Sequence, residues 1–158
     1  MKNNRPVILH VILMAIISAL LICYPSYSAA AECAPTDPDA LGPFYKAGAA
    51  ERMSVGKGYI LNGAVRSSED CSAVKGAKVE LWMTGPDGEY DDDHRAVLYS
   101  GKEGTYRFES NFPAGYLWRK PHIHIQVSAE GFGELITQHY PEKGKKQGFF
   151  DLVLVPSE

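Results

Sequence analysis

The segment "YLWRKPHIHIQV", residues 116–127, ends in an alternation of polar and apolar side chains. Alternate side chains of a β-strand point to the same face, so a strand here directs His122 and His124 one way and Ile123 and Ile125 the other. Two same-face histidines lie roughly 6.5–7 Å apart along a strand. That spacing lets both imidazoles reach one metal ion at about 2.1 Å each. The segment predicts a strand with an apolar core face and a candidate metal site on its opposite face.

Short runs with β-strand character continue along the rest of the chain and are separated by Gly-rich and Pro-rich turns. No segment has the spacing of an amphipathic helix. The further runs are "YILNGAV", "AKVELWMT", "AVLYS", "TYRFES", "ELITQHY" and "FFDLVLV". About seven short strands in a chain of this length favour an all-β fold, an antiparallel β-sandwich.

The N-terminus has the features of an export signal. Lys2 and Arg5 precede an apolar run, and small residues follow it; this pattern is typical of a cleaved secretory signal peptide. Two Ala-x-Ala-type exits fit, and an uncleaved anchor is the alternative. We expect residues 1–31 to be a signal peptide, residues 32–57 an irregular arm, and residues 58–158 the sandwich. The protein is then exported to the periplasm or the extracellular space and has no membrane segment after cleavage.

The charge and the cysteine content bear on the class of protein and on its disulfide bonding. The 158 residues include 16 basic and 19 acidic side chains, a net charge of −3, which does not provide the basic face of a nucleic-acid binder. Of three cysteines, Cys23 lies in the predicted signal. Cys33 and Cys71 remain as a pair in an oxidising compartment. A bond between them is expected to stabilise the fold by about 4 kcal/mol; two free buried thiols are the alternative.

A histidine pair alone does not establish a metal centre, because two histidines on an ordinary outer strand face give the same pattern. A site needs further ligands, and no cysteine is spare. His94, His139, carboxylates and tyrosines are the available donors. The residues alone do not decide which of these side chains complete the site.

Four motifs occur in one order: "LGPFY", "GAKVELWMTGPDGEY", "GTYRFES" running on through "NFPAGYLWRKPHIHIQV", and "ELITQHY". Together they resemble the catalytic core of the intradiol ring-cleaving dioxygenases, in particular the short secreted members. The resemblance spans about Leu41 to Tyr140. It implies an antiparallel β-sandwich fold.

The resemblance also implies a mononuclear Fe(III) cofactor held by two tyrosinates and two histidines. The matching positions are Tyr90, Tyr116, His122 and His124. Phenolate is a hard anionic donor that suits Fe(III), and imidazole suits iron in either state. The implied substrates are a small catechol-type molecule and O2, and the implied product is a cis,cis-muconate-type diacid.

Two residues gain catalytic roles from the resemblance. Arg119 stabilises charge that develops on the ring during oxygen attack, and Tyr116, once released from the metal, accepts a proton as a general base. Positions that resemble the substrate side or the surroundings of the site are Tyr45, Arg52, Trp118 and Gln138.

Two alternatives belong to other classes. One is a secreted β-sandwich binding module that keeps a metal site without turnover. The other is a cupin-like metal oxygenase, with His139 as a third histidine; no Glu stands at a natural spacing for that site. The chain has no room for the helical dimer region of the larger intradiol enzymes, and its oligomeric state is unknown.

Overall fold

The computed structural model describes residues 33–157, so the predicted signal peptide lies outside the described residues. Within this range the chain forms no helix, and hence none long and apolar enough to cross a membrane. The eight strands are β1 (Tyr59–Ser67), β2 (Lys78–Met83), β3 (Arg95–Tyr99), β4 (Thr105–Ser110), β5 (Ile123–Ser128), β6 (Leu135–His139), β7 (Gln147–Phe149) and β8 (Leu152–Leu154).

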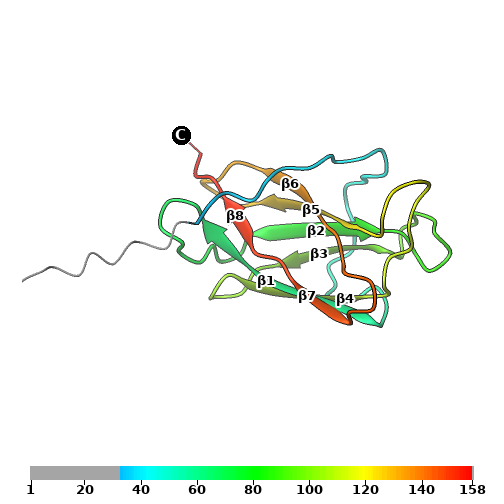
Figure 1. Cartoon of the computed structure of the whole chain (residues 1–158). Coiled ribbons are helices and arrows are strands. Elements are labelled where there is room, and N and C mark those ends of the chain that lie inside the picture. Colours follow the sequence, from blue (N-terminus) through cyan, green and yellow to red (C-terminus); the bar gives the residue numbers. More distant parts are fainter. Residues whose placement is uncertain (1–32, 158) are drawn as a thin grey trace, which may run out of the picture. The chain divides into compact units, whose positions relative to one another are not determined.

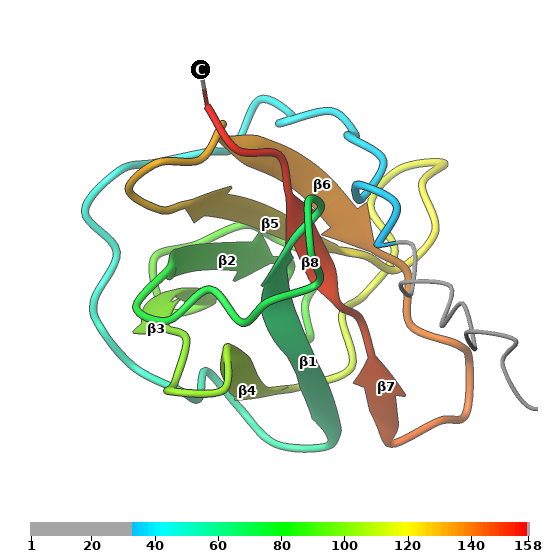
Figure 2. The same cartoon turned by 90° about the vertical axis from the view of Figure 1, so that its left-hand side faces the viewer.

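The strands form two sheets that face each other (Figures 1 and 2). One has the order β3-β2-β5-β6 and is antiparallel throughout. The other has the order β4-β1-β7, with β8 also pairing with β1. The predicted β-sandwich is confirmed.

The C-terminal run "FFDLVLV" was expected as one strand, and the structure divides it. Both β7 and β8 pair with β1 in parallel, and the two residues between them, Phe150 and Asp151, leave the ladder. The Asp151 carboxylate accepts the Ala64 amide at 2.8 Å, and Tyr106 donates its hydroxyl to the Phe150 carbonyl at 2.6 Å. A Cβ at Gly63 would overlap that same carbonyl. The absence of a side chain at Gly63 therefore lets the interrupted strand lie close to β1.

The core lies between the sheets and contains the inward side chains of both. Ile123, Ile125 and Val127 of β5 are fully buried there, as the alternation of residues 122–127 predicts. They pack with the other inward residues of the cluster, which include Tyr59, Leu61, Leu81, Phe108 and Leu152. Because the odd-numbered positions of β5 occupy the core, the even-numbered positions must face the outside of their sheet.

An extended arm, residues 33–58, covers part of that outside face and continues to the sandwich edge. Near its start it hydrogen-bonds to β6, with the Asp39 amide 2.9 Å from the Ile136 carbonyl. Further on it bridges to Val97 in β3 and Glu109 in β4. Figure 2 shows the arm passing from β6 around β2 and β3 towards β4.

A disulfide ties the beginning of the arm to the body. Cys33 and Cys71 are bonded, with their Cα atoms 5.4 Å apart and a sequence separation of 38. The predicted pairing is confirmed. In the chain-entropy view, closing a loop of this length stabilises the folded protein by about 4 kcal/mol.

His139 lies on the core side of β6 and supplies a test of the fold. Its Nε2 is 2.7 Å from the Tyr59 hydroxyl, and burial lowers its pKa from 6.5 to about 4. Between these pH values the unfolded chain binds a proton that the folded protein excludes. Stability is therefore complete above pH 6.5 and is lost as the pH falls towards 4, by at most about 1.4 kcal/mol per pH unit.

We expect His139→Gln, which keeps a hydrogen-bond acceptor but does not titrate, to lose less stability than the wild type between pH 7 and pH 5. Urea unfolding at both pH values measures the difference. Because the other histidines titrate in both proteins, only the gap between the two pH profiles reports on His139. Parallel profiles would contradict this account.

Candidate metal centre

Three side chains from two segments converge on one point outside β5. The Tyr90 hydroxyl lies 3.1 Å from Nε2 of His122 and 3.2 Å from Nε2 of His124. The two histidine nitrogens are 3.1 Å from each other. The three donor atoms thus form a nearly equilateral triangle, and a single ion can sit about 2.1 Å from each of them, the usual length of such bonds.

The loop between β2 and β3 brings Tyr90 to this point. Its turn is closed by hydrogen bonds between Gly85 and Glu89, 2.9 Å, and between Gly85 and Gly88, 3.0 Å. The Tyr90 ring then stacks on Phe44 of the arm, with ring centroids 4.3 Å apart. The arm therefore fixes the direction of a ligand that the sheet alone would leave free.

His122 is held in the tautomer that leaves Nε2 free to bind a metal, and the ring of His124 is held in place by packing. Nδ1 of His122 is 2.7 Å from the Lys120 carbonyl; since a carbonyl only accepts, Nδ1 carries the proton and Nε2 keeps its lone pair. The ring of His124 stacks on Trp82 at 4.9 Å, and a Cβ at Gly42 would run into that ring. An imidazole fixed through its other nitrogen is typical of metal ligands.

The electrostatics of the three donors also fit a cation. Burial lowers the pKa of His122 and lowers that of His124 to about 4, so both rings are neutral at neutral pH. Burial raises the pKa of Tyr90 to about 12, against the opposing effect of Arg119. The Tyr90 phenol therefore becomes an anionic ligand only when a positive charge lies against it, which is what a bound metal ion provides.

Tyr116 lies beside the triangle. Within residues 33–157, its hydroxyl is not hydrogen-bonded to any of the three donors. Its ring is 5.6 Å from that of Tyr90 and 5.1 Å from that of Phe44. It stands on the loop between β4 and β5, where Arg119 donates its amide to the Tyr116 carbonyl at 2.9 Å. Figure 1 shows this loop, in yellow, at the same end of the sandwich as the loop that carries Tyr90, in green.

Arg119 reaches the neighbourhood of the histidines from the same turn. Its guanidinium donates to Oε1 of Gln138 at 2.7 Å and to the Tyr140 hydroxyl at 2.8 Å. Gln138 is buried and is the cross-strand partner of His124. The structure thus brings Arg119 and Gln138 together.

The other predicted positions, Tyr45, Arg52 and Trp118, lie outside the triangle of donor atoms. Tyr45 packs edge-on against Trp82 at 5.3 Å and so touches His124 only through that ring. Arg52 donates to the carbonyls of Arg95, 2.9 Å, and Asp92, 2.8 Å, and so ties the arm to β3 and the loop before it. Trp118 is 87% exposed at the tip of its turn. Roles for these residues in binding substrate stay predictions.

The cupin-like alternative does not fit this arrangement. His139 bonds to Tyr59 and packs 5.5 Å from Phe150, on the side of β6 opposite Gln138. Within residues 33–157 no group of three or more His, Cys, Asp or Glu side chains gathers as a metal site. The convergent donors are two imidazoles and a phenol.

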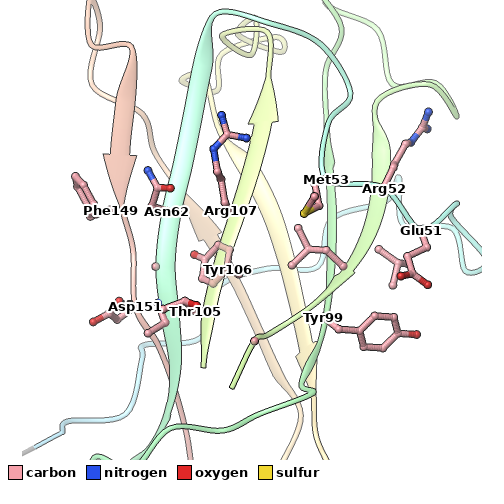
Figure 3. Close-up of a pocket in the computed structure, with 15 residues that line it drawn as sticks. Glu51, Arg52, Met53, Asn62, Tyr99, Thr105, Tyr106, Arg107, Phe149 and Asp151 are labelled. Carbon is pink, nitrogen blue, oxygen red and sulfur yellow. Dashed lines mark hydrogen bonds between the residues drawn. The ribbon is translucent and has the colours of Figure 1, made fainter. Parts of the chain in front are cut away.

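The cavities near the sandwich surface include two large ones. One of about 540 Å³ is bordered by Tyr140, Lys120 and Pro121, which adjoin the cluster. Another of about 940 Å³ lies elsewhere, between Tyr99 of β3, Arg107 of β4, Phe149 of β7 and Met53 of the arm (Figure 3). None of the three convergent donors lines either cavity.

Comparison with known proteins agrees with the geometry. Chlorocatechol 1,2-dioxygenase of Pseudomonas putida is 30% identical, with 66% of this chain and 53% of the relative covered. For 6-chlorohydroxyquinol 1,2-dioxygenase of Cupriavidus pinatubonensis the identity is also 30%, and the shares are 70% and 52%. The chain belongs to the intradiol ring-cleavage dioxygenase family. It spans about half the length of the curated relatives it matches.

The fold of the family is seen in a solved intradiol ring-cleavage dioxygenase from Tetranychus urticae. It superposes with a TM-score of 0.72 at 17% identity over 80% of this chain and 97% of that one. No family model matches the sequence.

We expect His122→Ala and His124→Ala each to lower affinity for Fe(III) at least about 10-fold, because each removes one corner of the triangle. Metal content after equilibrium dialysis measures this. The matched control is His94→Ala, since His94 bonds to Asp91 outside the cluster. Equal iron content in all three variants would contradict the assignment of His122 and His124 as metal ligands.

Proposed function

We propose that this chain binds a ferric ion through Tyr90, Tyr116, His122 and His124 and cleaves catechol-type rings between their hydroxylated carbons with O2. The observation that carries the proposal is the triangle of one phenol oxygen and two imidazole nitrogens in a member of the intradiol family. The expected product is a cis,cis-muconate-type diacid.

The donor set suits ferric iron. Two phenolates are hard anionic ligands that favour a trivalent ion over a softer divalent one, and the neutral imidazoles complete the set. When bound, the ion would supply a Lewis acid that makes the aromatic ring of a catechol reactive towards O2.

Tyr116 is suited to exchange between metal and substrate. It packs against two aromatic rings, and its hydroxyl makes no hydrogen bond to the triangle within residues 33–157, so it can move without breaking one. In the released state its oxygen accepts the proton of a catechol hydroxyl as a general base.

Arg119 supplies a fixed positive charge beside the cluster. Its two hydrogen bonds, to Gln138 and Tyr140, hold the guanidinium without neutralising it, because both partners are uncharged. A preorganised cation at this place stabilises negative charge that develops on the substrate during oxygen attack.

The enzyme is proposed to work outside the cytoplasm. Support comes from the signal-like N-terminus and from the Cys33–Cys71 disulfide, since structural disulfides persist in oxidising compartments. The ring cleavage proposed here takes both oxygen atoms from O2 and needs no external reductant, so it suits such a location.

Reconstitution tests the activity. Protein loaded with Fe(III) is expected to show a visible tyrosinate-to-iron band, to consume one O2 per catechol, and to form a product with the ultraviolet absorbance of a cis,cis-muconate. An oxygen electrode measures the O2 consumed, and spectrophotometry measures the visible band and the product. Metal-free protein is the control. A loaded, coloured protein that turns over no member of a catechol panel would point to a binding module.

Arg119→Ala separates metal binding from charge stabilisation. It is expected to retain iron and colour, and to shift that colour when catechol binds, but to lower turnover about 100- to 1000-fold. Loss of iron would make Arg119 a structural residue. Near-normal turnover would assign the developing charge to another group.

A further inference from the structure

Arg119 is connected to a carboxylate that does not touch it. Tyr140 accepts a hydrogen bond from the Arg119 guanidinium at 2.8 Å, and its own hydroxyl lies 2.8 Å from Oδ2 of Asp39. A tyrosine has one hydroxyl proton to donate. Its possible acceptors are the Asp39 carboxylate and, at 3.0 Å, Oε1 of Gln138. The carboxylate is the stronger acceptor because it is charged.

Asp39 is held in place independently of this contact. Its Oδ1 accepts the amide of Ala40 at 2.6 Å, and its own amide donates to Ile136 in β6. Burial raises the pKa of its carboxyl, but the hydrogen bonds from Ala40 and Tyr140 and the charge of Arg119 lower it below the ordinary value. The side chain is therefore ionised at neutral pH, on a backbone fixed to the sheet.

Gln138 closes the same network from the other side. Its side-chain amide donates to the Ala40 carbonyl at 2.6 Å, and its Oε1 accepts from Arg119. The arm residues Asp39 and Ala40 thus support both acceptors of the arginine, Tyr140 and Gln138. Sequence separations of 101 and 98 residues make these contacts invisible to local patterns.

We propose that Asp39 and Tyr140 are positioning residues that orient the Arg119 guanidinium towards the metal cluster. The inference rests on the proposed function for its catalytic consequence. Asp39 polarises the Tyr140 hydroxyl, and the polarised oxygen holds one N–H of Arg119. The guanidinium keeps its full charge, because a direct ion pair with Asp39 is replaced by a neutral intermediary.

The arrangement distinguishes Asp39 from a residue that merely anchors the arm. Anchoring is already provided by backbone hydrogen bonds and by Thr137, whose hydroxyl donates to the Asp37 carbonyl at 2.9 Å. Asp37 is an exposed carboxylate two residues away on the same arm. Asp37→Asn therefore removes the same charge from the same segment without touching the network, and it is the matched control.

The first measurement uses metal-free protein, so that it does not depend on catalysis. The Arg119 side-chain N–H signals, assigned by their loss in Arg119→Ala, are followed by nitrogen-resolved NMR. We expect proton exchange at Arg119 to be about 5- to 10-fold faster in Asp39→Asn and Tyr140→Phe, as the loss of one hydrogen bond would produce. Asp37→Asn should match the wild type.

The second measurement uses iron-loaded protein and catechol. Asp39→Asn and Tyr140→Phe should each lower kcat about 10-fold, as a misplaced catalytic group does, and leave iron content and colour unchanged. Because the two residues act through one bond, the double variant should be no slower than Tyr140→Phe alone. In an Arg119→Ala background, Asp39→Asn should have no further effect.

The two measurements fail in different ways. If no catechol is turned over, the proposed function is wrong, and the NMR comparison alone decides the positioning roles. If Asp39→Asn exchanges and reacts like Asp37→Asn, the positioning role of Asp39 is refuted. A further loss of turnover on adding Asp39→Asn to Arg119→Ala would also refute it, since the effect would then not pass through the arginine.

Discussion

The pleat of β5 places one strand between two buried environments. Ile123, Ile125 and Val127 fill the sandwich core, while His122 and His124 are 2% exposed on the opposite face. An outer sheet face normally meets water, and two buried imidazoles there need a covering layer. The extended arm supplies part of it, through Gly42 against His124 and Phe44 against Tyr90. The remaining features of the site follow from the need to cover this face.

The covering layer explains why the donors are preorganised. Trp82, the cross-strand neighbour of His124, stacks on its ring, and the Lys120 carbonyl fixes the tautomer of His122. Each contact restricts a proposed ligand and leaves its Nε2 free. A site restricted in this way binds a cation without paying again for ordering its side chains.

Local patterns in the sequence were sufficient for the strands and for the two histidines, because alternation along one strand is a property of neighbouring residues. The proposed ligand Tyr90 required the family resemblance, since its place next to His122 depends on a loop 32 residues earlier in the chain. Asp39, Phe44 and Tyr140 gave no signal of their own. Their roles arise from contacts between segments whose relative placement only the complete fold determines. The division of the C-terminal run into β7 and β8 was missed for the same reason, as it depends on the approach of Phe150 to Gly63.

The long reach of the arm has a consequence for the order of folding. Thr36 pairs with Val153, 117 residues later, and Asp39 reaches Tyr140 across 101 residues. A ribosome adding about 5–20 residues per second takes roughly 5–20 s to make that interval, and throughout it Thr36 and Asp39 lack these partners. Contacts this distant also make for slow closure of the native topology. The cover over the donors can therefore be completed only when nearly the whole chain is present, which would make capture of the proposed metal a late event in the maturation of the protein.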